Sequence, residues 1–341
     1  MLRGAGQPNG WRGLALFWAL ALLAAGAGAA ALQLLGPPAA PVVAKLKPVV
    51  VPEPVVVTDV AKPRPLPDLR PGSVSTGPIA DPDPALLDPE GLPQIGPDGR
   101  TPGQAYASGF AAQPGRPRIG LIIAGMGMSE ADSVQAIQLP AGITLAFSPY
   151  ATPNPALLDQ ARRAGHELLL ALPLEPVGYP LNDPGEHALM TGASLEQNAR
   201  NLDWALSRFA GYAGTTAALG GPLNGERFAV VAEQLHPMLA SIAARGLYYV
   251  DARVGPSVLP SVWNRPIDSI VDDPVNAASL EAKLAVLEST ARNKGSALGL
   301  VGLATPVTIE RLAAWTNGLA ARGFVLAPAS ALMLPPNEVP K

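Results

Sequence analysis

The side chains best suited to chemistry in this sequence are charged residues that follow short apolar runs. Asp251 ends the run at 247–251, and Arg253 stands two residues further on. The functional groups of α/β folds gather at the carboxyl ends of strands. We therefore expect both at one site, with Asp251 accepting hydrogen bonds from hydroxyls and Arg253 holding an anionic or carbonyl oxygen. The alternative is an ion pair that only closes the end of the strand.

Other carboxylates and one tryptophan are further candidates. Glu175 lies between two prolines after an apolar run, where it would either line the same site or cap a loop. Asp272 and Asp273 are adjacent acids, although Asp before Pro also favours a turn. Trp263 lies in an irregular stretch and is the candidate for stacking on a bound ring. Two other tryptophans, Trp204 and Trp315, fall within predicted helices, where core packing is favoured.

No metal site is predicted from the histidines. The chain has three, and a catalytic zinc needs about three protein ligands. His166 stands at a predicted helix end, His187 in a loop, and His236 inside a helical stretch before Pro237. No pair has ligand spacing. A site built from carboxylates alone would suit magnesium or calcium.

The stretch 118–129 predicts the first structural unit that could position these groups. An uncharged apolar run at 119–123 has the length of a buried parallel strand. It is followed by a glycine turn at 124–127 and by Ser129, which can cap a helix. A catalytic residue is expected at position 124, where the chain has Ala124 and Gly125.

The same strand–turn–helix pattern repeats along the chain. Apolar runs predict strands at 143–147, 167–172, 212–216, 247–251, 297–301 and 324–326. Helices are predicted between them, at 155–163, 195–209, 227–245, 280–294 and 306–322. Four helices end in a basic residue near a glycine, which suits the negative helix end and a left-handed cap: Arg163/Gly165, Arg245/Gly246, Lys294/Gly295 and Arg322/Gly323. We predict an α/β fold, a parallel sheet closed or partly closed into a (β/α) barrel.

The region before the predicted barrel has a different composition. Residues 1–35 contain an uncharged run at 14–32 after Arg3 and Arg12. This pattern predicts a transmembrane helix that anchors the chain in the inner membrane with the rest in the periplasm. The alternative is a cleaved signal peptide that sends the protein to the periplasm. Residues 36–117 are rich in proline and are predicted to form a disordered linker.

Bulk composition excludes some classes of protein. The net charge is −3, which gives no electrostatic basis for binding nucleic acid. The chain has no cysteine, so disulfides and thiolate chemistry are excluded.

Several short segments follow one another in a fixed order: Ile-Thr-Leu-Ala-Phe-Ser-Pro-Tyr at 143–150, Ala-Gly-His-Glu at 164–167, Leu-Pro-Leu-Glu-Pro at 172–176, Leu-Met-Thr-Gly at 189–192, Arg-Gly-Leu at 245–247 and Asp-Ala-Arg at 251–253. In this order they resemble the divergent polysaccharide deacetylase family, a NodB-like exported branch with a distorted (β/α) barrel. The resemblance spans residues 118–333 and implies a domain at 118–335 that acts on envelope carbohydrate.

The chain departs from the family at the catalytic motifs. The family reads Ile-Asp-Asp-Leu-Gly where this chain has Ile-Ala-Gly-Met-Gly at 123–127, and His-Leu-Pro-Met-Glu-Pro where it has Ala-Leu-Pro-Leu-Glu-Pro at 171–176. It reads Asn-His-Met-Gly-Ser where this chain has Ala-Ala-Leu-Gly-Gly at 217–221, and Gly-His-Pro where it has Gly-Leu-Ala at 302–304. The positions that lose Asp or His are Ala124, Gly125, Ala171, Ala218 and Leu303.

Asp251, Arg253 and Glu175 keep the family's residue type, which implies catalytic positions. The family would use a divalent metal such as zinc, whose ligands are absent here, so no cofactor is predicted. Three hypotheses follow. The chain is a non-catalytic barrel that binds an envelope polysaccharide or peptidoglycan glycan or serves as a scaffold, an active deacetylase with a relocated site, or a structural envelope protein that binds other proteins.

Overall fold

The computed structural model describes residues 17–23, 26, 72, 77–152, 154–257 and 259–337. The chain divides into two compact units, Met1–Lys62 and Pro63–Lys341. In the first unit, residues 17–23 and 26 are helical. Among all described residues, none of the helices has both the length and the apolar character required to cross a membrane. Most of the predicted membrane segment at 14–32 lies outside the described residues, as does most of the predicted linker up to residue 76.

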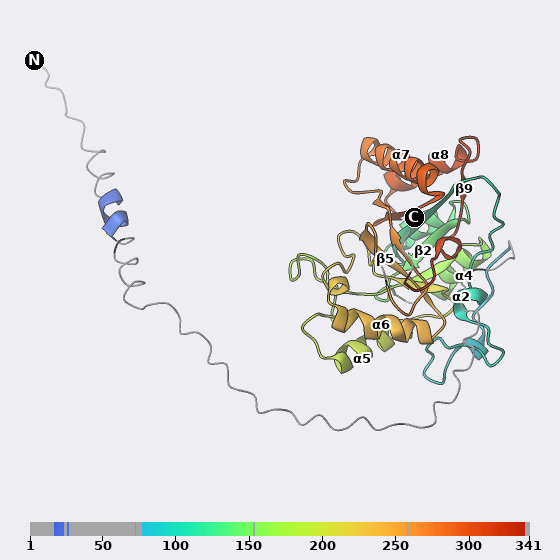
Figure 1. Ribbon diagram of the computed structural model, residues 1–341, viewed down its shortest axis with the longest axis horizontal. Helices are drawn as coiled ribbons and strands as arrows, with labels where there is room; N and C mark the ends of the chain where they lie inside the picture. Colours follow the sequence, from blue (N-terminus) through green and yellow to red (C-terminus); the bar gives the residue numbers. More distant parts are fainter. Residues whose placement is uncertain are drawn as a thin grey trace, which may run out of the picture. The chain divides into compact units, whose positions relative to one another are not determined.

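The second unit is built on a parallel sheet that supports the predicted barrel (Figure 1). Along the sheet the strands run in the order β6-β5-β4-β3-β2-β1-β8-β7, and β9 pairs with β1. Their bounds are β1 Arg118–Met126, β2 Ile143–Phe147, β3 Leu168–Ala171, β4 Gly214–Thr216, β5 Tyr248–Val254, β6 Asn264–Ile267, β7 Ser269–Ile270, β8 Ser296–Val301 and β9 Val325–Leu326. Every strand that sequence predicted is present, with shifts of one or two residues at most boundaries.

The short segment 264–270 nearly closes the sheet into a barrel. Its first half, β6, pairs with β5, and its second half, β7, pairs with β8. Between them the backbone N–H of Asp268 donates to the Leu298 carbonyl at 2.8 Å, and its carboxylate accepts from the Leu298 N–H at 2.9 Å. Sequence reasoning missed β6 and β7 because Asn-Arg-Pro-Ile-Asp-Ser-Ile contains no apolar run. The segment also contains the buried Arg265, whose positive charge is compensated by an ion pair with Asp268 at 3.1 Å.

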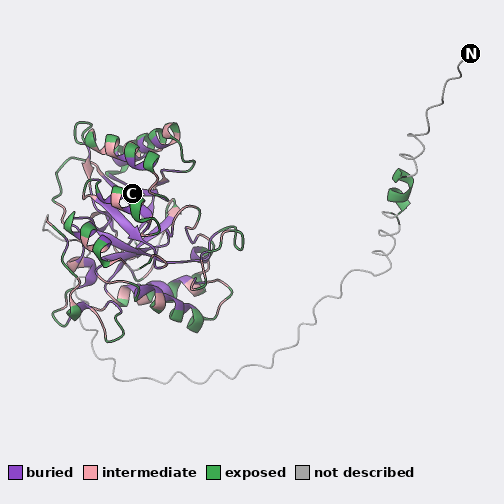
Figure 2. Cartoon of the chain, turned by 180° about the vertical axis from the view of Figure 1, so that it is seen from behind, coloured by how far each residue is buried: buried purple, intermediate pink, exposed green. Residues whose placement is uncertain are grey.

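Helices cover the outside of the barrel and leave its strands buried (Figure 2). α5 and α6 lie side by side on one flank, and α7 and α8 lie side by side on another (Figure 1). The helices are α2 Pro102–Ala105, α3 Glu130–Ile137, α4 Pro155–Arg163, α5 Leu195–Leu206, α6 Ala232–Ala244, α7 Ala277–Lys294 and α8 Pro306–Asn317. The 3₁₀ turns are η1 Pro84–Leu86, η2 Phe228–Val230 and η3 Ala329–Leu332.

The predicted helix starts are confirmed, but the helix predicted at 306–322 ends at Asn317, so Gly323 ends a turn and does not cap the helix. Ser129 and Thr305 accept hydrogen bonds from the first turns of α3 and α8, and Ser194 does so in α5. All four glycines predicted to follow helices have left-handed φ angles: Gly165 at 84°, Gly246 at 70°, Gly295 at 84° and Gly323 at 91°. The predicted helix at 227–245 is in fact divided, because Val231 takes an extended conformation between η2 and α6.

Residues 77–117 are ordered on the barrel unit, which corrects the predicted linker boundary at 117. Leu86 and Tyr106 are buried in the core, and Thr101 caps α2. Pro84 and Pro102 stand at helix starts, where a missing N–H costs no hydrogen bond. These prolines therefore start short turns, which composition alone does not distinguish from a disordered spacer.

A buried carboxylate that sequence reasoning missed ties this segment to the amino ends of the strands. Glu167 precedes β3 and is 0% exposed. Its Oε2 accepts from the Ser108 N–H at 3.0 Å, and its Oε1 accepts from the Ser330 N–H at 3.0 Å and from the Tyr248 hydroxyl. Burial raises the pKa of Glu167. One side chain thus joins the leading segment, β5 and the carboxyl-terminal turn η3.

Candidate functional site

Glycine backbones from the end of β1 and from two loops meet at the carboxyl ends of the strands. A Cβ built on Gly220 would lie 3.3 Å from the Cα of Gly125 and 3.4 Å from the Gly302 carbonyl oxygen. The Gly221 N–H donates to that same oxygen at 3.1 Å. Gly125 and Gly220 have φ angles of 69° and 133°, in the region that favours glycine. We call this contact of Gly125, Gly220, Gly221 and Gly302 the glycine seam.

The glycine seam brings together three of the four altered motifs. A Cβ on Gly125 would lie 3.5 Å from Cδ2 of Leu303, so the segments 123–127, 217–221 and 302–304 converge. The altered positions Ala124, Ala171 and Ala218 are each 0% exposed, whereas Leu303 is 45% exposed. Met126 and Leu219, which sequence suggested could fill the mouth, are buried as well.

The seam does not offer the donors that a divalent metal needs. Within the described part of the chain, no group of three or more His, Asp or Glu side chains could hold a metal ion. A zinc ion would require about three such ligands. The residues at the mouth do not fit the metal that the resemblance implies, because small and apolar side chains and closely packed backbone occupy those positions.

Asp251 and Arg253 form a closed pair at the end of β5. Nε of Arg253 lies 2.9 and 3.1 Å from the two oxygens of Asp251, and its Nη2 lies 2.6 Å from Oδ2. The Arg253 backbone N–H also donates to Asp251, at 3.1 Å. The hydrogen bond to Asp251 raises the pKa of Arg253. Asp251 is 0% exposed, so the geometry matches the ion-pair interpretation of this spacing.

Glu175 is also engaged by its neighbours. It is 3% exposed, and its Oε2 accepts from both the backbone N–H and the hydroxyl of Thr191, each at 2.6 Å. Its Oε1 pairs with Nε of Arg227 at 3.1 Å. Glu175 thus joins the segment 172–176 to the segment 189–192, two stretches that carried the resemblance.

Asp272 and Asp273 have different surroundings. Asp272 accepts from the backbone N–H groups of Gly302 and Leu303 at 2.8 and 2.9 Å, so it holds the last altered motif in place. Asp273 is exposed to solvent. The helix that follows is capped by Asn276, which accepts from the Ser279 N–H at 2.9 Å.

A cleft of about 420 Å³ opens beside the glycine seam, and we call it the acidic cleft. This volume is in the range of small-molecule sites. The lining comes from loops at the carboxyl ends of the strands and includes Glu226, Asp272, Asp273, Asn182 and Asn224, with apolar walls from Val177, Pro222, Ile270, Val275 and Leu303. The structure therefore brings Asp272 and Asp273 together with the altered position Leu303.

The remaining predicted residues lie elsewhere. Trp263 immediately precedes β6, at the opposite end of the barrel from the acidic cleft, and packs against the core. His166 is buried with its ring nitrogens 2.8 and 3.0 Å from two backbone carbonyl oxygens. His187 stacks on Trp204 at 3.9 Å between ring centroids. His236 is exposed on α6.

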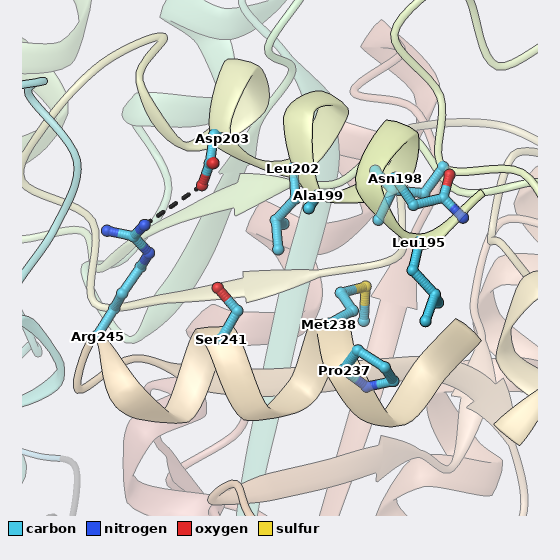
Figure 3. Close-up of a pocket in the computed structure, with 10 residues that line it drawn as sticks. Leu195, Asn198, Ala199, Leu202, Asp203, Pro237, Met238, Ser241 and Arg245 are labelled. Carbon is cyan, nitrogen blue, oxygen red and sulfur yellow. Dashed lines mark hydrogen bonds and ion pairs between the residues drawn. The ribbon is translucent and has the colours of Figure 1, made fainter. Parts of the chain in front are cut away.

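A second hollow lies between α5 and α6 (Figure 3). Its volume is about 200 Å³. Leu195 and Leu202 of α5 and Met238 of α6 line it, and an ion pair of 3.3 Å between Asp203 and Arg245 lies at one end. Its walls are mostly helical and hold no residue of the altered motifs.

One feature of the acidic cleft could not be predicted from the sequence, namely the unpaired side-chain oxygen of Asn224. The residue is 4% exposed, yet its Oδ1 has no hydrogen-bond partner among the described residues. A buried polar atom without a partner costs about 1–3 kcal/mol. A ligand or a water molecule bound in the cleft would satisfy such an atom.

Replacing Asn224 with Leu is expected to raise the free energy of unfolding by about 1 kcal/mol, since the unsatisfied amide is exchanged for an apolar side chain of similar size. Urea denaturation measures it. The matched control is Asn201→Leu. The side chain of Asn201 is bonded at both ends, to Gln197 at 2.9 Å and to the Ala188 carbonyl at 2.7 Å, so this change should destabilise by about 2 kcal/mol. Equal losses in both variants would contradict this interpretation of Asn224.

The fold and the converging motifs define a (β/α) barrel of the polysaccharide deacetylase type. The family model for divergent polysaccharide deacetylases matches residues 121–333. The chain belongs to this family, which confirms the resemblance read from its motifs.

A solved structure supports the same conclusion. The crystal structure of the uncharacterized protein ATU2773 from Agrobacterium tumefaciens C58 is 31% identical in sequence to this chain and has a TM-score of 0.64. The match covers 71% of this chain and 98% of that one. No curated protein matches this chain. Family membership implies carbohydrate binding.

Proposed function

We propose that this protein binds an envelope polysaccharide or peptidoglycan glycan without deacetylating it. The observation that carries the proposal is the glycine seam. Where the family places carboxylates and histidines for a metal, this chain has backbone packed on backbone, with a Cβ on Gly220 only 3.3 Å from Gly125. A deacetylase of this kind needs a metal to polarise the amide carbonyl and activate water, and the seam supplies neither ligands nor room for one.

The acidic cleft is the surface that would bind the glycan. Sugars present hydroxyl groups, which donate well to carboxylate and amide oxygens, and apolar faces, which pack on side chains such as Val177 and Val275. Carbohydrate recognition therefore survives the loss of the metal ligands, because it depends on different residues.

The N-terminal sequence supports a location of this protein in the cell envelope. An uncharged run at 14–32 after basic residues favours a helix that anchors the chain in the inner membrane, with the barrel in the periplasm. Cleavage after a signal peptide would deliver the same barrel to the periplasm without an anchor.

The test measures binding, metal content and acetate release with the full-length chain. We expect affinity for amino-sugar oligomers or peptidoglycan fragments, less than about a tenth of an equivalent of zinc after incubation with zinc and desalting, and no acetate from N-acetylated oligomers. Gly220→Ser serves as a matched variant. It disturbs the seam and should leave acetate release at zero.

Acetate release with about one equivalent of bound metal would overturn the proposal in favour of an active deacetylase with a relocated site. The retained pair Asp251 and Arg253 is the specific observation that favours this second candidate. In that case Asp251→Asn should abolish acetate release. Capture of a protein partner, with no affinity for any glycan, would instead favour a structural envelope protein.

A further inference from the structure

The acidic cleft has a charge of one sign. Its charged residues are Glu226, Asp272 and Asp273, and no Lys, Arg or His contributes to its lining. None of the three carboxylates has an ion-pair partner within 4.0 Å among the described side chains; the nearby Arg227 pairs with Glu175 instead. Uncompensated carboxylates around one cleft produce a negative potential that favours a cationic ligand.

Several hydrogen-bond donors at the cleft are already used by the protein. The backbone N–H groups of Gly302 and Leu303 donate to Asp272, and that of Gly221 donates to the Gly302 carbonyl. The Val177 N–H lies 3.4 Å from Glu226. An acetamide carbonyl needs a donor, and these particular N–H groups are not available to it.

Several hydrogen-bond acceptors at the cleft, by contrast, have no strong partner within the protein. Asp273 is exposed and has no hydrogen bond among the described residues, and Glu226 makes only the long contact with Val177. Asn224, which is 4% exposed, is one of the residues that line the cleft, and its buried Oδ1 has no partner among the described residues. This orphaned oxygen is independent of the carboxylates and indicates a ligand that donates hydrogen bonds. An ammonium group with adjacent hydroxyls donates several.

A metal ion is not the cation that these residues fit. No cluster of three or more potential ligands exists in the described part of the barrel unit, and both oxygens of Asp272 are occupied by backbone N–H groups. The apolar walls formed by Val177, Val275 and Leu303 suit an organic cation with a hydrocarbon face.

We propose that the acidic cleft selects a deacetylated amino sugar, with a free ammonium group, over its N-acetylated form. This inference rests on the proposed function and names the class of glycan. The protein would then recognise the product of glycan deacetylation, so a reaction that removes acetyl groups must supply its ligand.

The experiment titrates the full-length chain with a glucosamine tetramer and with an N-acetylglucosamine tetramer by isothermal calorimetry at pH 6, below the pKa of an ordinary amine. We expect the glucosamine tetramer to bind about tenfold more tightly at low salt. The ratio should shrink toward one at about 0.5 M salt, because ions screen an exposed cleft.

Variants assign the preference to the cleft. Asp273→Asn is expected to reduce the preference about threefold, and Asp273→Asn combined with Glu226→Gln should remove it. The matched control is Glu90→Gln, which removes one exposed charge from the segment before the barrel and should leave the ratio unchanged. Asn224→Leu should weaken both tetramers alike.

The outcomes separate this inference from the proposed function. Equal or tighter binding of the acetylated tetramer would overturn the preference and leave glycan binding intact. Loss of preference in Glu90→Gln would also overturn it. No binding of either tetramer or of peptidoglycan fragments would overturn the proposed function itself. A lysine-rich peptide that binds more tightly than the glucosamine tetramer, with the same dependence on Asp273, would assign the cleft to a protein partner instead.

Discussion

Replacing Glu167 with Leu is expected to lower the free energy of unfolding by about 3 kcal/mol. The change leaves the backbone N–H groups of Ser108 and Ser330 and the hydroxyl of Tyr248 buried without their acceptor. Each such group costs about 1–3 kcal/mol, partly offset because a buried carboxyl is removed. Chemical denaturation followed by circular dichroism measures the loss.

The matched variant Glu167→Gln tests the role of the proton. Burial raises the pKa of Glu167 in the folded protein, whereas in the unfolded chain the carboxyl titrates near about 4.3. Between these two pKa values the folded state keeps a proton that the unfolded state has lost. The contribution of Glu167 is therefore complete below the unfolded pKa and is lost as the pH rises through the folded pKa.

Glutamine cannot titrate, so the advantage of wild type over Glu167→Gln should be greatest near pH 4 and should decrease as the pH rises. The decrease should reach at most about 1.4 kcal/mol per pH unit, the value for one proton. A difference that grows with pH would show that Glu167 is ionised in the folded protein, and would contradict the assignment.

The second large effect concerns Glu175. Replacing it with Gln is expected to cost about 2 kcal/mol of stability, because two short hydrogen bonds from Thr191 to a buried carboxylate are weakened. In a double-mutant cycle with Thr191→Val, the two changes should be strongly non-additive, with a coupling of about 1.5 kcal/mol. Thermal and urea unfolding of the four proteins provide the measurement.

Arg227→Ala is the control for this cycle. The Arg227 side chain is 53% exposed, so its ion pair with Glu175 should contribute no more than about 0.5 kcal/mol. If Glu175→Gln left stability unchanged but removed binding or activity, the residue would have the functional role that its family position suggested. We expect the reverse, since its carboxylate oxygens are already occupied.

Features encoded by neighbouring residues could be predicted from the sequence. The apolar runs at 119–123 and 143–147 are buried strands, as their length and composition require. The helix caps at Ser129 and Thr305 and the left-handed glycines after α4, α6 and α7 were predictable too, because a cap depends on residues within one turn. The family could also be recognised from the sequence, because each of its motifs consists of a few neighbouring residues and the motifs occur in a fixed order.

The sequence was less informative wherever a residue's role depends on distant partners. The spacing of Asp251 and Arg253 allowed either a site or an ion pair, and only side-chain geometry shows that they satisfy each other. The carboxylate of Glu175 accepts hydrogen bonds from Thr191 in another loop, and that of Glu167 accepts hydrogen bonds from residues 108, 248 and 330. None of these partners can be inferred from local spacing.

The sequence by itself determined most of the strands and helices, the family, and the small or apolar residues at the altered motifs, because these are properties of residue type and short-range order. Tertiary structure decided three other matters. The polar segment 264–270 closes the barrel by pairing on both sides. Prolines between 77 and 117 start packed turns. Glycines from β1 and two loops meet where three of the altered motifs converge, and the Oδ1 of Asn224 has no partner among the described residues beside an acidic cleft. Each depends on pairing between residues far apart in the chain, which no local pattern specifies.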